Sequence, residues 1–199
     1  MLFLRWKAGS ISLKSKGNNM EIFTERLVLK EVTWDDLPQV HHLHSIPEVD
    51  EFNTLGIPFT MDETRELLRP EIEAMEKSPR GRYTFCIRIK ETDEFIGLSG
   101  YTLSNDKFRL GEIYYKLLPD YWGRGYATEV AKKMISVGFM DFGLHKVEAG
   151  TALGNERSIR VLEKAGMTRE GLRRKILPIR GEWVDGYLFA IVEDDERDY

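Results

Sequence analysis

The order of periodic segments between residues 110 and 152 constrains the fold of this chain more than any other feature. Leu110 to Leu118 alternates between apolar and polar residues as a strand does, and Lys146 to Ala152 has the pattern of a second strand. Between them, a helix follows the loop from Pro119 to Gly125 and ends near Phe142, with its apolar residues on one stripe. A strand, a helix and a further strand in this order form a right-handed crossover, which predicts that the two strands are parallel neighbours in one sheet.

The segments around this unit predict antiparallel strands and further helices. The expected strands are Arg26 to Val32, Tyr83 to Lys90, Phe95 to Ser104, and a closing hairpin of Met167 to Leu177 with Trp183 to Val192. The expected helices run from Thr33 to about His44, from the capping residue Thr60 to about Lys77, and from Asn155 to Ala165. We therefore expect an α/β fold of the α+β type, with a mixed, mostly antiparallel sheet, one parallel strand pair and helices on both faces.

Length and composition indicate one globular domain. The chain has 199 residues, of which 42% are hydrophobic, and this excludes global disorder. Residues 1–19 hold four basic residues and no acid, and Met20 opens the first patterned segment. We expect residues 1–19 to be a basic extension that is either disordered or an artefact of the chain start, and residues 20–199 to form the single domain.

Charge and cysteine content narrow the class of partner and the compartment. The formal net charge is −4, and because residues 1–19 carry four positive charges, the rest of the chain carries −8. An acidic body disfavours nucleic acid and favours cationic small molecules or basic protein segments as partners. The single cysteine excludes an internal disulfide and favours the cytoplasm, and no apolar run reaches the length of a membrane helix.

The histidines of one helix and the single cysteine are expected to be structural. His41, His42 and His44 share a helix, but they lack a carboxylate at the spacing that a metal site would use, so we expect no metal. Cys86 lies among apolar strand residues, which predicts a small core residue rather than an acyl carrier.

The loop before the long helix has the features of an anion-binding site. Gly123 and Gly125 precede the helix, whose first N–H groups have no acceptor within the helix and carry partial positive charge. A Walker loop is excluded because no Gly-Lys-Ser/Thr occurs. A dinucleotide fingerprint is excluded because Thr128 stands at the place of its third glycine. Taken alone, the two glycines also fit a tight turn.

Two motifs in the same order carry a resemblance to a known family. The first is Gly123 to Ala127 with an aromatic residue at Trp122, and the second is Gly154 to Met167, one strand later. Together with Thr24 to Leu29 and Trp183 to Tyr187, they make the sequence resemble the GNAT superfamily of acyl-CoA-dependent N-acetyltransferases. Within it, the sequence is most similar to the ribosomal-protein (Rim-type) branch, over nearly all of residues 24–192.

The resemblance implies coenzyme A, in the form of acetyl-CoA, as the cofactor. Gly125 and Ala127 match the family loop that binds the pyrophosphate through its backbone without a metal, whereas Trp122 departs from the family pattern. Asn155 is expected to hydrogen-bond the pantetheine arm, which would lie as a pseudo-strand between the two splayed parallel strands. The expected cofactor-binding residues are Leu117, Leu118, Trp122, Gly123, Arg124, Gly125, Tyr126, Ala127, Thr128 and Asn155.

Acetyl transfer to an amine needs a polarised carbonyl, a neutral amine and a proton for the departing thiolate. A backbone N–H near Leu117 is the candidate for the first task. Glu112 is the candidate base, with Glu148 on the neighbouring strand as its rival, although both acids also fit ordinary surface positions. Ser158 matches the serine of the Rim-type branch and is the candidate proton donor, because Leu162 stands where many superfamily members have a tyrosine. Its alternative role is to cap the helix.

We therefore expect an acetyl-CoA-dependent N-acetyltransferase, an enzyme of the acyltransferase class, that acts on a primary amine. The preferred acceptor is a protein N-terminal α-amine of the ribosomal-protein type. The alternatives are a small polyamine or an amine antibiotic as acceptor, or a catalytically silent acyl-CoA-binding module. We expect no nucleic acid and no membrane as partner, and a homodimer is left open.

Overall fold

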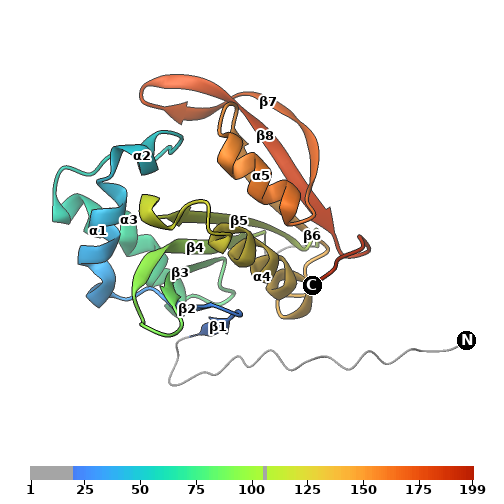
Figure 1. The fold of residues 1–199 in the computed structure, drawn as a ribbon, viewed down its shortest axis with the longest axis horizontal. Coiled ribbons are helices and arrows are strands. Elements are labelled where there is room, and N and C mark those ends of the chain that lie inside the picture. The colour runs from blue at the N-terminus through green and yellow to red at the C-terminus, as the bar shows by residue number, and fades with distance from the viewer. Residues whose placement is uncertain (1–19, 105–106) are drawn as a thin grey trace, which may run out of the picture.

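The computed structural model describes residues 20–104 and 107–199, and these residues form one eight-stranded sheet with helices packed on it (Figure 1). The strand order is β1-β2-β3-β4-β5-β6-β8-β7. The strands are β1 (Glu21–Phe23), β2 (Leu27–Glu31), β3 (Arg82–Ile89), β4 (Phe95–Leu103), β5 (Leu110–Leu117), β6 (Lys146–Ala152), β7 (Thr168–Ile179) and β8 (Glu182–Val192). The α-helices are α1 (Leu37–His44), α2 (Pro47–Asp50), α3 (Met61–Glu73), α4 (Tyr126–Met140) and α5 (Glu156–Lys164).

Pairing within the sheet confirms the mixed architecture predicted from the sequence. β3, β4 and β5 form an antiparallel meander, and β7 and β8 form a hairpin. β5 and β6, which are joined through α4, are the parallel pair. β6 pairs antiparallel with β8, and β7 therefore lies at the edge of the sheet.

Two short elements go beyond the predicted ones. β1 has three residues and is too short to show a periodic pattern, although it pairs with β2 throughout. α2 is a single helical turn that begins at Pro47, a residue favoured in the first turn of a helix. Two helices also end earlier than the sequence predicts. The helix expected to reach Lys77 ends as α3 and continues in a 3-10 turn, Ala74–Glu76, and α4 ends before Phe142.

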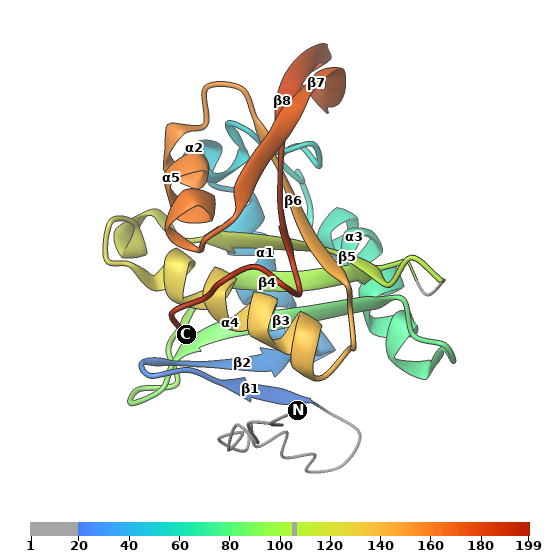
Figure 2. The same cartoon turned by 90° about the vertical axis from the view of Figure 1, so that its right-hand side faces the viewer.

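The helices cover both faces of the sheet (Figure 2). α1 and α3 pack on one face, where Val40 and Leu68 meet buried residues of β3 and β4. α4 and α5 pack on the other face through Met134 and Leu162. Cys86 is buried on the α1 face, and its burial raises the pKa of the thiol, which confirms the core role predicted for it. No helix among the described residues combines the length and the apolar character that crossing a bilayer requires.

The N-terminal extension predicted for residues 1–19 lies outside the described residues. Met20, the first described residue, packs against the core, and its backbone N–H donates to Glu31 Oε2 at 2.6 Å. We expect a chain that starts at Met20 to keep its melting temperature within a few degrees and to bind acetyl-CoA as the full chain does. Thermal denaturation with and without acetyl-CoA measures both, and a larger loss would show that residues 1–19 belong to the domain.

Candidate active site

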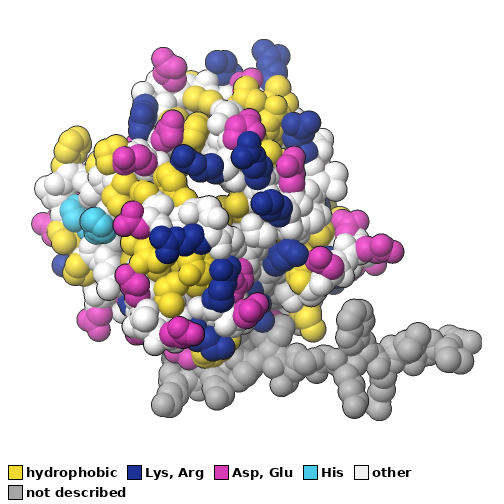
Figure 3. Space-filling view, in the orientation of Figure 1, with side chains coloured by type: hydrophobic (Ala, Val, Ile, Leu, Met, Phe, Trp, Pro, Cys, Tyr) yellow, Lys and Arg dark blue, Asp and Glu magenta, His cyan; other side chains and the backbone are white. Residues whose placement is uncertain are grey.

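The parallel strands β5 and β6 separate after a short common stretch. They are in register from Leu110 opposite Lys146 to Glu112 opposite Glu148, and both strands run on beyond this stretch without pairing to each other. We call the gap between their C-terminal ends the slot. Figure 3 shows an opening at this place, between α5 and the end of β5, with Lys and Arg side chains around its rim. The splayed pair expected from the sequence is therefore present.

Backbone groups of β5 point into the slot at alternate residues. The N–H of Leu118 donates to the carbonyl of Ile96 at 2.9 Å and so faces β4. Successive residues of an antiparallel ladder direct their N–H and C=O groups to opposite sides. The backbone N–H and C=O groups of Leu117 and Tyr115 therefore face the slot. The Leu117 carbonyl accepts a hydrogen bond from Trp122 Nε1 at 2.8 Å. The slot edge therefore offers the N–H of Leu117, whereas the N–H of Leu118, predicted to lie at the same edge, is used inside the sheet.

The facing edge of the slot is formed by β6. The N–H of Leu153 donates to the Asp185 carbonyl at 2.9 Å, on the side of β8. By the same alternation, the backbone groups of Gly150 and Ala152 face β5. Both edges thus carry backbone donors and acceptors, to which an extended molecule can add in the manner of a strand.

The glycine loop leads from the end of β5 into α4. Gly123 and Gly125 have φ angles of +72° and +81°, in the left-handed region that favours glycine. Gly125 is the N-cap of α4 and provides no side chain to the helix end. The N–H groups of Tyr126, Ala127 and Thr128 therefore lack carbonyl acceptors within the helix, and the positive end of the helix dipole adds to their attraction for an anion.

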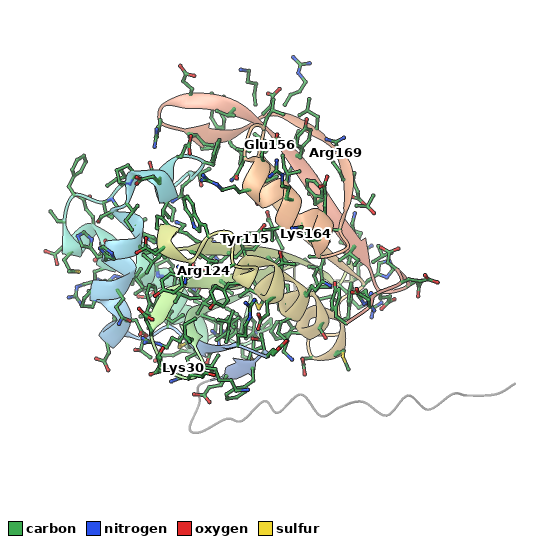
Figure 4. The ribbon with its side chains drawn as sticks, in the orientation of Figure 1. Lys30, Tyr115, Arg124, Glu156, Lys164 and Arg169 are labelled. Atoms are coloured by element: carbon green, nitrogen blue, oxygen red, sulfur yellow. The ribbon has the colours of Figure 1, made fainter. Side chains whose placement is uncertain are left out.

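Ser158 lies in the first turn of α5 and is held by two other residues. Its backbone N–H donates to Asn155 Oδ1 at 3.1 Å, so Asn155 caps the helix. Its Oγ lies 3.0 Å from the hydroxyl of Tyr115, a residue that is labelled in Figure 4, and this hydroxyl is also placed to donate to the Ser158 carbonyl at 3.3 Å. Burial raises the pKa of Tyr115, and the bond to Ser158 lowers it in part. Leu162, at the position where many superfamily members have a tyrosine, is fully buried in the core.

Comparison with protein families agrees with this geometry. The profile of the acetyltransferase (GNAT) domain matches residues 26–168. The chain belongs to the GNAT acetyltransferase family. A curated relative, the uncharacterised N-acetyltransferase p20 of Bacillus licheniformis, is 31% identical to this GNAT protein over 173 residues, which cover 86% of this chain and 96% of the relative.

Solved structures share the fold of this GNAT protein. The spermidine N-acetyltransferase of Vibrio cholerae, in complex with CoA and spermine, superposes with a TM-score of 0.73 at 21% identity and covers 84% of this chain and 96% of its own. The ribosomal-protein-S5-alanine acetyltransferase of Vibrio fischeri superposes with a TM-score of 0.75 at 22% identity and covers 89% of this chain and 99% of its own. The protein is an N-acetyltransferase that uses acetyl-CoA, as predicted.

Hydrogen bonds from the turn before β2 hold the glycine loop of this GNAT domain in place. Glu129, in the first turn of α4, accepts hydrogen bonds from Thr24 Oγ1 at 2.6 Å, from the Arg26 N–H at 2.9 Å and from Arg26 Nε at 2.7 Å. Arg26 Nη1 also donates to the Arg124 carbonyl at 3.0 Å. Although burial raises the pKa of Glu129, the bonds from Thr24 and Arg26 lower it below its ordinary value, so the carboxylate remains charged. The sequence pattern marks Thr24 and Arg26 only as family residues and gives no sign of this contact across more than 100 positions.

The two candidate bases lie opposite each other at the closed end of the slot. Glu148 Oε1 is 3.2 Å from Lys146 Nζ, and this lysine also pairs with Glu170 at 2.6 Å. Glu112 is exposed, and its Oε1 is 3.6 Å from the position that a Cβ on Gly150 would take. Within the described residues, the Glu112 carboxylate has neither a hydrogen bond nor an ion pair. The geometry therefore favours Glu112 over Glu148 as the base.

A cluster of polar residues lies at the end of β5, on the face of the sheet that carries α1. Burial lowers the pKa of Lys116 to about 8, and the nearby charge of Asp50 opposes this shift. Burial, with the charge of Lys116 next in size, lowers the pKa of His44 to about 3, so this imidazole is neutral at physiological pH. Asp50 Oδ2 lies 3.6 Å from Arg180 Nε, and among the described residues Asp50 Oδ1 has no hydrogen-bond donor. Two cations therefore surround one carboxylate here.

Proposed function

We propose that this N-acetyltransferase transfers the acetyl group to the N-terminal α-amine of a protein or peptide, in the manner of the Rim-type branch. The observation that carries the proposal is the charge on the α1 side of the slot, where Lys116 and Arg180 accompany the carboxylate of Asp50. Polyamines carry several positive charges and are disfavoured by such a surface. An α-amine carries one charge, has a pKa of about 7.7–8.0, and is already partly neutral at pH 7.

The site has the features that coenzyme A binding needs. The free N–H groups at the start of α4 fit the pyrophosphate, and the open left-handed backbone at Gly123 leaves space for its approach, since an added Cβ there would meet no atom within 4 Å. The backbone edge of Gly150 and Ala152 fits the pantetheine amides. Bound acetyl-CoA would supply the acetyl group as a thioester within the slot, which has Leu117 at its open end and Glu112 at its closed end.

Each residue of the site then has one task. The N–H of Leu117 donates to the acetyl oxygen and stabilises the negative charge that develops on it. Glu112, which is free of ion pairs among the described residues, takes a proton from the acceptor ammonium so that the amine attacks in its neutral form. Glu112 lies five positions before Leu117 on β5, about 17 Å away, so this proton passes through water molecules. Ser158 directs its hydroxyl hydrogen toward the departing sulfur when the one hydrogen of the Tyr115 hydroxyl is donated to Ser158 Oγ rather than to the Ser158 carbonyl, which leaves the serine hydrogen available.

The proposed acceptor is tested with a panel of amines. The purified protein is incubated with acetyl-CoA and with peptides that have a free N-terminus, the same peptides with a blocked N-terminus, spermidine or spermine, and thiol release is measured. We expect turnover with the free peptides alone. Turnover with the polyamines alone would overturn the proposed acceptor. Binding of acetyl-CoA without thiol release from any acceptor would favour a catalytically silent module.

A further inference from the structure

The hairpin of β7 and β8 carries a dense set of cations on an otherwise acidic protein. Between Thr168 and Gly181 there are five basic residues and one acid, whereas residues 20–199 as a whole carry a net charge of −8. Two of the five are engaged within the protein. Arg169 lies over the Tyr187 ring at 4.7 Å (labelled in Figure 4), and Arg180 donates to the Pro47 carbonyl at 3.3 Å.

The side chains of the other three cations, Arg173, Arg174 and Lys175, are free. All three residues are exposed, and their side chains make no hydrogen bond, ion pair or ring contact with any described residue. They lie at an irregularity of the hairpin, where the register with β8 shifts after Arg173. Lys175 has a φ of +50°, and its backbone N–H donates to Asp185 Oδ1 at 2.8 Å. The fold therefore fixes the backbone at this place and leaves three consecutive cations to the solvent.

Exposed apolar side chains accompany these cations. Leu172, Ile176 and Trp183 lie on the same hairpin and are 50%, 40% and 60% exposed. Figure 3 shows Lys and Arg side chains beside apolar ones over β7 and β8, at the top of the molecule. Tryptophan and arginine are the residue types most enriched at the centres of protein interfaces. We call these six residues the hairpin surface.

The register of the sheet places the hairpin surface near the slot. Ala152, at the slot edge, is opposite Gly186 of β8, and Gly186 is opposite Arg173 of β7. Two strand spacings separate Ala152 from Arg173, a distance of about 10 Å. An extended peptide covers this distance in about three residues. β7 is also the edge strand of the sheet, so its outer backbone groups are available to a partner strand.

We propose that the hairpin surface binds an acidic, extended segment of the acceptor protein, which begins about three residues after the amine that enters the slot. This inference rests on the proposed function, because it requires a peptide acceptor. Carboxylates of the segment pair with Arg173, Arg174 and Lys175, and its apolar residues pack on Leu172 and Trp183. Electrostatic complementarity of this kind selects partners and speeds their encounter. The enzyme therefore prefers N-termini that are followed by Asp and Glu over N-termini that are followed by Lys.

The test uses three peptides and two variants of the full chain. The peptides share a free N-terminal residue; one is a dipeptide, and two are octapeptides with either Glu or Lys at positions 4–7. The variant Arg173→Glu/Arg174→Glu reverses two cations of the hairpin surface. The matched control, Lys77→Glu/Lys90→Glu, makes the same change in net charge at two exposed residues outside the hairpin. KM, kcat and the Kd of acetyl-CoA are measured at low and at high salt.

For the wild type, we expect the KM of the Glu peptide to be about tenfold or more below that of the Lys peptide, with the difference shrinking at high salt. In Arg173→Glu/Arg174→Glu this preference should vanish or reverse. The acetyl-CoA Kd and the turnover of the dipeptide should stay unchanged in this variant, and the control variant should keep the wild-type preference. Equal KM values for the two octapeptides, or a preference that survives the reversal, would overturn the inference while peptide acetylation itself continues. If no peptide were acetylated, the proposed function would fail instead.

Discussion

Ser158→Ala is expected to lower turnover by roughly 10- to 1,000-fold, and we expect the lower half of this range because a coenzyme A thiol is a fairly good leaving group. The acetyl-CoA Kd should change by less than about tenfold, because the lost interaction forms in the transition state. The backbone N–H of Ser158 still donates to Asn155 Oδ1 in this variant, so the cap of α5 is preserved. Single-turnover measurement of thiol release under saturating acetyl-CoA checks the chemical step.

Tyr115→Phe is the companion variant, because the Tyr115 hydroxyl has Ser158 as its partner. If the phenol orients the serine hydrogen, Tyr115→Phe should reproduce most of the loss seen in Ser158→Ala, and the double variant should lose no more than Ser158→Ala alone. If the loss of turnover in the double variant equalled the product of the losses in the two single variants, the two hydroxyls would act separately. Wild-type turnover in Ser158→Ala would return Ser158 to the first turn of α5 as a structural residue and leave water as the proton donor.

Asn155→Ala separates binding from chemistry at the same helix. Asn155 Oδ1 caps α5, so its loss costs about 1 kcal/mol of stability. Because its side-chain amide is the expected partner of the pantetheine arm, acetyl-CoA binding should weaken more than the chemical step. In Ser158→Ala, by contrast, the chemical step should slow more than acetyl-CoA binding weakens. Each of the two variants is therefore a control for the other.

The fold could be predicted from the sequence because its main signals are local. The alternation of β5, the helical stripe of α4 and the pattern of β6 are continuous in the chain, and the handedness of crossovers then makes the two strands parallel. β1 and α2 escaped prediction because three or four residues contain no full period. The same locality made the glycine loop visible, since the positive φ of Gly125 and the start of α4 are neighbours in sequence.

The parts of the site that could not be predicted depend on contacts between distant residues. Tyr115 meets Ser158 across 43 positions, and no pattern in either segment announces the pair. A signal for Tyr115 does exist in its strand, because it shares the parity of Leu117 and its side chain therefore lies on the face of the sheet that carries α4 and α5. The choice between Glu112 and Glu148 likewise depends on Lys146, which pairs with Glu148 and leaves Glu112 free among the described residues.

Gly125→Val is expected to weaken coenzyme A binding by about 30-fold or more. At a φ of +81°, a β-branched residue is strained, so the loop must change its backbone and turn its N–H groups away from the pyrophosphate position. An added Cβ would also approach Arg26 Nη2 to 3.4 Å, in the network that fastens the loop to Glu129. The strain alone should lower the free energy of unfolding by about 1–2 kcal/mol. Binding and stability must therefore be measured separately.

Gly143→Val is the matched control for this strain. Gly143 follows the opposite end of α4 with a φ of +62°, and an added Cβ there would meet no described atom within 4 Å. Its melting temperature should fall by an amount similar to that of Gly125→Val, because the same kind of backbone strain is introduced, while its coenzyme A affinity should equal that of the wild type. Calorimetric titration with coenzyme A and with pantetheine, which lacks the pyrophosphate, completes the test. We expect Gly125→Val to lose affinity for coenzyme A alone, and an unchanged affinity would remove the loop from the pyrophosphate site.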